Sequence, residues 1–121
     1  MSHTAAARTS LIQVVVAVPN RRVGRVLAQG ALAAGLAACV QISGPMTSHY
    51  VWKGRTESAR EHLVFFKTRR SCFRALARLV RTLHPYEVPE ILLFPIVAAD
   101  AAYARWMEQS LRRPSRSRRR A

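Results

Sequence analysis

Two prolines four positions apart, Pro85 and Pro89, place the strongest constraint on how this chain can fold. A proline ring fixes its own φ and restricts the residue before it to an extended conformation. A helix that approaches this segment is therefore predicted to end near Leu83, with residues 84–90 forming an extended connector. The connector carries an imidazole, a phenol and two carboxylates, which belong to His84, Tyr86, Glu87 and Glu90. This density of titratable groups between apolar segments marks a candidate site.

Alternating strand and helix patterns flank the connector. Residues 11–18 are a mostly β-branched apolar run typical of a buried strand, and Asn20 is suited to cap the helix that follows. Gly44-Pro45 is expected to bend the second strand, because proline cannot donate to a β-ladder. The expected elements are strands at 11–18, 38–42, 47–53, 61–68 and 90–97, and helices at 21–34, 71–83 and 100–111.

This order of elements predicts an α+β fold. Two right-handed β-α-β units joined by a hairpin give a ferredoxin-like βαββαβ sandwich, in which helices cover one face of an antiparallel sheet. A short C-terminal helix follows. With 121 residues the chain has room for one domain, expected over residues 11–111. Residues 1–10 are expected to be a flexible N-terminus, and residues 112–121 a disordered arginine-rich tail.

The hairpin within residues 47–68 is expected to project beyond the body of the domain. Side chains alternate along a strand, so Ser48, Tyr50 and Trp52 share one face. Two aromatic side chains on a projecting face need a partner surface. Tyr50 and Trp52 therefore predict that the chain forms an oligomer.

A formal net charge of +14 makes polyanions candidate partners. Six of the twenty cationic residues lie in the tail, namely Arg112, Arg113, Arg116, Arg118, Arg119 and Arg120. The tail is therefore a candidate contact for nucleic acid or another polyanion. The alternative is that the arginines are solvated surface charges, because no recognition helix, zinc-finger spacing or aromatic RNA-binding motif accompanies them.

The two cysteines, Cys39 and Cys72, form no CxxC pair, which favours a reducing compartment over a disulfide framework. Cys72 is expected to be exposed in the first turn of a helix. The apolar run at residues 11–18 is too short to span a bilayer, so we expect a cytoplasmic protein without a membrane partner. The sequence has no nucleophile-base set, glycine-rich phosphate loop or HExxH motif. We therefore predict neither an enzyme nor an organic cofactor.

Four segments of the chain resemble the CutA divalent-cation tolerance family. They are GLAACV at residues 35–40, TSHYVWKG at 47–54, Lys67-Thr68, and HPYEVPEI at 84–91, and the likeness continues through Tyr103 and Trp106. The resemblance covers residues 11–111. It implies a ferredoxin-like homotrimer that takes part in the tolerance of copper and other divalent metal ions.

The candidate metal ligands are His84, Glu87 and Glu90, because imidazole with carboxylates suits copper, zinc or nickel. The alternative for His84 is a helix-terminal histidine whose ring bonds the last helix carbonyls. Some members of the family are described with copper ligands at positions that correspond to Val16, Leu83 and His84. Only His84 is of a ligand type in this chain.

The resemblance also implies a cleft between subunits. The residues expected there are Trp52, Lys67, Tyr86 and Cys39, next to the connector carboxylates. Two carboxylates that share such a pocket would raise the pKa of one of them and make the site capable of acid/base chemistry. One alternative is a purely structural interface in which Lys67 pairs with a carboxylate. The alternative for Cys39 is a small buried thiol at the start of a strand.

These patterns favour a trimeric protein of the response to divalent metal ions, copper in particular, that binds a metal or small ligand at its subunit clefts. The alternative is a non-catalytic trimeric scaffold or signalling-type module whose basic tails bind polyanions or partner proteins.

Overall fold

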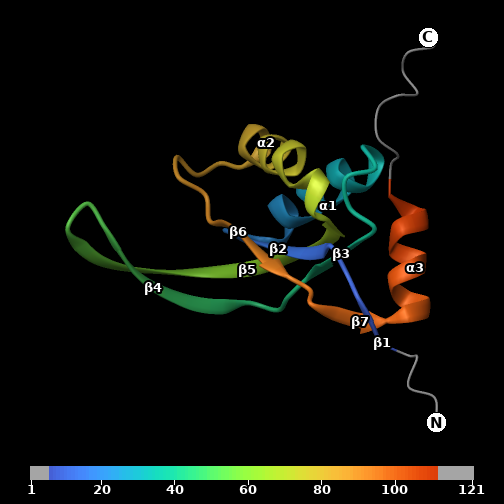
Figure 1. Cartoon of the computed structure of the whole chain (residues 1–121). Helices are drawn as coiled ribbons and strands as arrows, with labels where there is room; N and C mark the ends of the chain where they lie inside the picture. The colour runs from blue at the N-terminus through green and yellow to red at the C-terminus, as the bar shows by residue number, and fades with distance from the viewer. Residues whose placement is uncertain (1–5, 112–121) are drawn as a thin grey trace.

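An antiparallel sheet of five strands carries two helices on one of its faces (Figure 1). The computed structural model describes residues 6–111. The main elements in chain order are β2 (Leu11–Val18), α1 (Arg21–Ala33), β3 (Cys39–Ile42), β4 (Met46–Trp52), β5 (Arg55–Arg69), α2 (Phe73–Leu83) and β6 (Ile91–Pro95). The strand order is β3-β5-β2-β6, and β4 pairs with β5 beyond the bend at residues 43–45. With β3 and β4 counted as the two parts of one bent strand, the expected βαββαβ order and the antiparallel sheet are confirmed.

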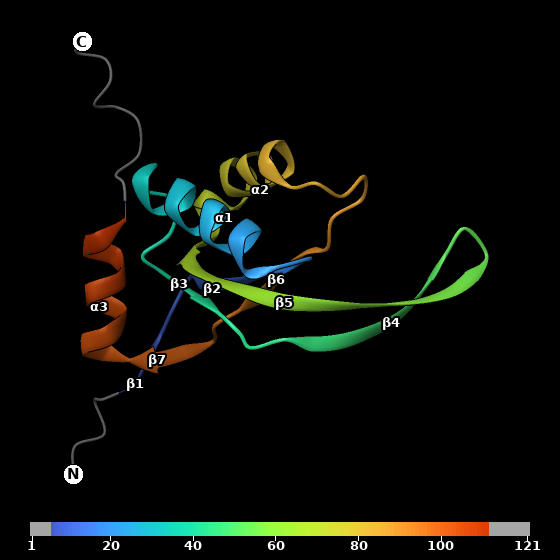
Figure 2. The same cartoon turned by 180° about the vertical axis from the view of Figure 1, so that it is seen from behind.

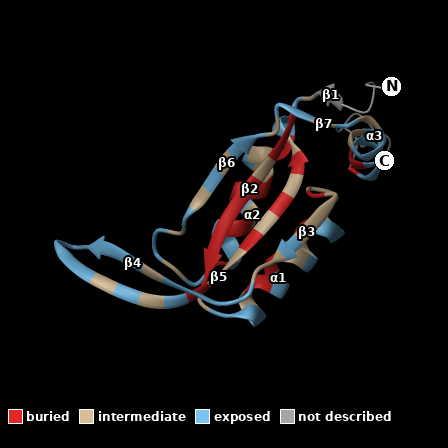
Figure 3. Ribbon diagram, turned by 90° about the horizontal axis from the view of Figure 1, so that it is seen from below, coloured by how far each residue is buried: buried red, intermediate tan, exposed pale blue. Residues whose placement is uncertain are grey.

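The two faces of the sheet differ because side chains alternate along each strand. One face of β2, formed by Ile12, Val14, Val16 and Val18, is fully buried beneath the helices together with Val64 and Phe66 of β5. The opposite face carries the register pairs Val15 with Phe65 and Ala17 with Leu63, and we call it the open face. In the view from below, α1 and α2 lie behind the sheet and α3 lies at its end (Figure 3).

Helix α1 begins at the capping residue that the sequence indicates and packs closely on the sheet. The Asn20 side chain caps α1 by accepting a hydrogen bond from the Val23 N–H at 2.9 Å. Gly24 faces the sheet so closely that a Cβ there would lie 3.3 Å from both Ile42 and Val64. Helix α1 therefore packs closely on the sheet.

Two large apolar side chains of the helices are exposed. They are Val26 of α1 at 43% and Leu83 of α2 at 41%. The expectation that Cys72 is exposed is wrong. It belongs to a 3-10 turn, η1 (Arg70–Cys72), that precedes α2, and it is buried.

The hairpin of β4 and β5 extends well beyond the helices (Figure 1). Its two-residue turn has positive φ at both Lys53 (52°) and Gly54 (78°), the pattern of a type I′ turn that suits tightly paired strands. Trp52 pairs with Arg55 directly across this turn. The returning strand therefore runs over fifteen residues from Arg55, not from Glu61 as the sequence analysis expects.

A small second sheet and the last helix lie at the end of the molecule opposite the hairpin tip (Figures 1 and 2). Strand β1 (Ala6–Arg8) pairs with β7 (Ala98–Asp100), and α3 (Ala101–Ser110) follows with Asp100 as its N-cap. The expectation of a flexible N-terminus over residues 1–10 is corrected for Ala6–Arg8. Residues 1–5 and the predicted disordered tail at 112–121 lie outside the described residues.

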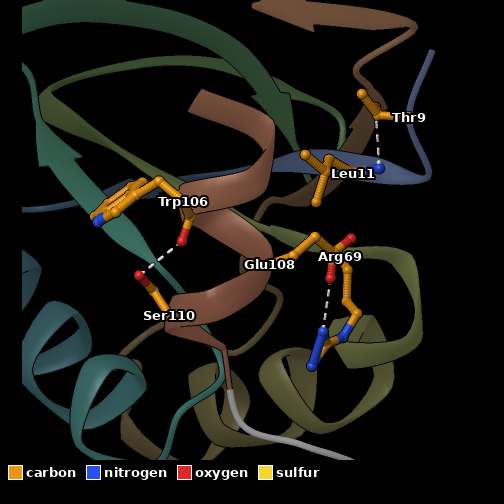
Figure 4. A network of polar contacts seen from close by, with 6 residues as sticks. All are labelled: Thr9, Leu11, Arg69, Trp106, Glu108 and Ser110. Atoms are coloured by element: carbon orange, nitrogen blue, oxygen red, sulfur yellow. Dashed lines mark hydrogen bonds and ion pairs between the residues drawn. The ribbon is translucent and has the colours of Figure 1, made fainter. Parts of the chain in front are cut away.

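Helix α3 docks on the sheet through a buried side chain and an ion pair. Met107 is almost fully buried, and Arg69 of β5 donates to Glu108 at 2.9 Å (Figure 4). Thr9 accepts a hydrogen bond from the Leu11 N–H in the same region. Among residues 6–111, no helix is both long enough and apolar enough to cross a membrane.

Candidate functional site

The connector at residues 84–90 runs extended, as its prolines require. His84 ends α2 with φ −81° and ψ 137°, which is the conformation that a following proline imposes. The His84 N–H still donates to the Val80 carbonyl at 2.8 Å. Residues 85–90 then cross to the start of β6, which lies at the edge of the sheet next to β2.

The His84 ring fastens the connector to the centre of the sheet. Its Nε2–H donates to the Ala17 carbonyl of β2 at 2.8 Å, and its Nδ1 accepts from the Tyr86 N–H at 3.1 Å. These two bonds define one neutral tautomer and occupy both ring nitrogens. The ring is 7% exposed and lies 4.6 Å, centroid to centroid, from the Tyr86 ring. The alternative expectation, that this ring bonds the last carbonyls of the helix, is wrong. The ring Nε2–H donates to the Ala17 carbonyl instead.

Tyr86 reaches from the connector to a buried carboxylate on β5. Its hydroxyl donates to Glu61 Oε2 at 2.7 Å, and Glu61 is 7% exposed. Burial, and then this hydrogen bond to an anionic acceptor, raise the pKa of the Tyr86 phenol. Glu61 is not among the site residues predicted from the sequence. The signal that marks it is a single carboxylate where the hairpin strand becomes an apolar run, on the same face of β5 as Leu63.

These residues form the wall of a pocket between the hairpin and the connector. The pocket has a volume of about 670 Å³. Aromatic rings from both sides line it, and its lining is Ala17, Ser48, His49, Tyr50, Trp52, Glu61, Pro85, Tyr86, Glu87, Val88 and Glu90. Tyr50, Trp52, Tyr86, Glu87 and Glu90, which the sequence analysis singles out, thus lie around one space.

The pocket is acidic. Its lining contains three carboxylates and no lysine or arginine. At the hairpin tip, Lys53 Nζ lies 5.6 Å from the centroid of the Trp52 ring. Partial burial and repulsion from Glu61 raise the pKa of the Glu90 carboxyl. In a pocket that two carboxylates share, the pKa of one is expected to rise. Here that carboxyl is Glu90, and Glu61 is the second carboxylate. Carboxylates beside aromatic faces favour a cationic ligand.

Two other expected cleft residues lie elsewhere on the chain. Lys67 of β5 is opposite Cys39 of β3 in the sheet register. Its Nζ donates to the side-chain oxygens of Gln13, at 3.0 Å, and Gln41. The Cys39 thiol lies beside Tyr103 of α3, where burial, and then the thiol, raise the pKa of the phenol. Within one chain the expected cleft is therefore divided into the acidic pocket and this lysine–cysteine group.

No metal site forms within the described part of a single chain. Among residues 6–111, no three histidine, cysteine, aspartate or glutamate side chains gather closely enough to hold a metal ion. His84 has no free nitrogen lone pair in this arrangement. Residues 6–111 of a single chain therefore do not by themselves fit a bound divalent ion.

The chain is similar to known proteins over nearly its whole described length. A model of the family described as CutA1 divalent ion tolerance protein matches residues 12–110. The divalent-cation tolerance protein CutA of Thermus thermophilus is 37% identical over 97 residues, which are 80% of this chain and 94% of that protein.

Plant relatives are also similar. The chloroplastic CutA protein of Arabidopsis thaliana is 40% identical over 101 residues, covering 84% of this chain and 56% of that protein. The chain thus spans little more than half the length of such plant relatives. The crystal structure of CutA1 from Oryza sativa superposes with a TM-score of 0.83 at 37% identity, covering 87% of this chain and 96% of that one.

Proposed function

Because this chain belongs to the CutA1 divalent ion tolerance family, we propose that it acts in the response to divalent cations, copper in particular. It does so as a homotrimer that binds a metal ion or a small cationic ligand at its subunit clefts. The observation that carries this proposal is the acidic aromatic pocket, whose lining has three carboxylates and no lysine or arginine.

The trimer is supported by apolar surface that one chain leaves uncovered. Leu92 and Phe94 of the edge strand β6 are 47% and 49% exposed, and their register partners Val15 and Gln13 place them on the open face. Tyr50 and Trp52 on the projecting hairpin are also partly exposed. Large exposed apolar areas in a soluble domain favour association, and identical copies of this chain would cover one another's open faces.

A cleft between copies would also bring together the expected site residues that lie apart within one chain. Among the described residues, the Lys67 Nζ donates to the amide oxygens of Gln13 and Gln41 and to no carboxylate, whereas the pocket lining has carboxylates without a lysine or arginine. An interface that sets the lysine–cysteine group of one copy against the acidic pocket of another would complement both charges. The same interface would bring donors from a second chain to any metal ion near Glu61 and Glu90.

A titration with copper(II) tests the binding claim. Trp106→Phe leaves Trp52 as the sole tryptophan, so fluorescence then reports the pocket. We expect saturable quenching that weakens about tenfold or more in Glu61→Gln and Glu90→Gln, but not in Glu57→Gln, whose carboxylate is not in the lining. Equal copper affinity in all four proteins would contradict metal binding in the pocket, and a parallel titration with a small organic amine tests the other ligand class.

The remaining parts of the proposal follow the chemistry of the chain. The protein is non-catalytic and cytoplasmic, since its sequence carries no nucleophile-base set and its cysteines no disulfide pattern. The alternative, a scaffold or signalling-type module that binds polyanions through its basic tail, concerns residues outside the described range. Deleting residues 112–121 tests it, because unchanged polyanion binding would exclude the tail.

A further inference from the structure

The outer surface of the helices concentrates the positive charge of the folded domain. Seven arginines project from α1 and from η1 with α2, and all seven are exposed. We call them the arginine face: Arg21, Arg22, Arg25, Arg70, Arg74, Arg78 and Arg81. Helices α1 and α2 lie side by side over the same face of the sheet, so their arginines belong to one side of the molecule (Figures 1 and 2).

None of the carboxylates of the chain belongs to α1, η1 or α2. All six belong to the hairpin, the connector or the α3 end, namely Glu57, Glu61, Glu87, Glu90, Asp100 and Glu108. Among the described residues, an ion pair joins Arg69 to Glu108, and none joins a carboxylate to any of the seven arginines. The positive charge of this face is therefore not neutralised within residues 6–111.

The spacing of the arginines along α2 makes a straight row. Arg74, Arg78 and Arg81 follow one another at four and three residues, so they share one side of the helix. Each residue advances a helix by about 1.5 Å, and the row thus extends for about 10 Å. Arg70 precedes this row in η1. A nucleic acid duplex carries one phosphate charge per about 1.7 Å of its axis, and the planar guanidinium fork matches phosphate oxygens.

The exposed apolar side chains of α1 and α2 indicate which class of polyanion this face suits. They are Val26, Leu32 and Leu83, and none is aromatic. A surface that lies in a lipid interface usually inserts tryptophan, phenylalanine or a broad leucine face, and single-stranded nucleic acid is bound by stacking on aromatic rings. Both features are missing from this face. We propose that the arginine face binds the phosphate backbone of duplex nucleic acid without reading its sequence.

Fluorescence anisotropy with a labelled short DNA duplex of arbitrary sequence, measured over a series of salt concentrations, tests this proposal. The test variant is the triple Arg74→Gln, Arg78→Gln, Arg81→Gln in the full chain, because glutamine preserves helix propensity. The matched control is Arg55→Gln, Arg60→Gln, Arg105→Gln, three exposed arginines outside the face. Circular dichroism verifies that both variants fold.

We expect the test variant to lose affinity at least about tenfold and its salt slope to decrease by about 2 to 3, since each phosphate contact contributes about 0.9. The control should keep the wild-type slope. Equal losses in both triples, or no loss in either, would overturn the proposal. So would binding to anionic phosphatidylserine vesicles in place of the duplex. Because copper binding is read at Trp52, a failure here is separate from a failure of the acidic pocket.

Discussion

His84 joins three parts of the chain that are distant in sequence. Its backbone ends α2, its Nδ1 orders the connector at Tyr86, and its Nε2–H reaches Ala17 in the central strand. Since the ring is buried, each of these bonds replaces one that water would otherwise make. The residue that looks most like a metal ligand in the sequence thus has a structural position in the fold.

His84→Ala is expected to lower the free energy of unfolding by about 2 to 4 kcal/mol, because it leaves the Ala17 carbonyl unpaired and opens a cavity. His49→Ala removes an exposed imidazole and should cost less than about 0.5 kcal/mol. Urea unfolding at one fixed protein concentration measures both. A cost no larger for His84 than for His49 would contradict the structural role.

Glu90 is expected to make stability depend on pH. Its carboxyl pKa is raised in the folded chain, so folding disfavours its charged form. The penalty is absent below the unfolded pKa, grows as pH rises through the raised folded pKa, and is complete above it. Glu90→Gln should therefore raise the melting temperature at neutral pH and have no effect near pH 4, with Glu57→Gln as the control for a lost charge. A gain that is independent of pH would refute this linkage.

At the scale of elements, the approach of α1 to the sheet depends on the missing side chain of Gly24. Gly24→Val is expected to cost about 1 to 3 kcal/mol, because the new methyl groups would overlap Ile42 and Val64. At Gly44, a Cβ would meet no atom within 4 Å, so Gly44→Val is the matched control and should be close to neutral. Thermal unfolding of both variants measures the two losses of stability. Equal losses would show that the helix can shift away from the strand.

Local chemistry allowed most elements to be predicted from the sequence. Asn20, Asp100 and the prolines of the connector act on their immediate neighbours, and each lies where its chemistry requires. The pairing of β1 with β7 could not be predicted, because it joins residues about ninety positions apart and neither segment shows an alternating pattern. The Glu61–Tyr86 hydrogen bond could not be predicted for a similar reason, since it depends on where β5 places Glu61 relative to the connector.

At the scale of the whole molecule, the uncovered apolar surface lies on one side and the arginine face on the other. Leu92 and Phe94 project from the open face, whereas α1 and α2 cover the opposite one. Association through the open face therefore leaves the arginines of every copy accessible. The two proposals for this protein are compatible in one assembly.

Phe94→Glu is expected to convert a trimer into monomers, because it puts a charge into the apolar surface that copies would share. Leu32→Glu is the matched control, since Leu32 is similarly exposed at 47% but lies on the helix side. Light scattering coupled to size-exclusion chromatography gives the masses. A monomeric wild-type protein, or a trimeric Phe94→Glu variant, would contradict the proposed assembly.

The central position of β2 has a consequence for hydrogen exchange. This strand is bonded to β5 on one side and β6 on the other, is covered by the helices, and carries the His84 bond at Ala17. Its amides are expected to exchange with deuterium only through global opening, whereas those of the hairpin tip near Gly54 exchange through local fluctuations. Mass spectrometry of deuterated peptides would then report the stability of the whole fold from residues 11–18 alone.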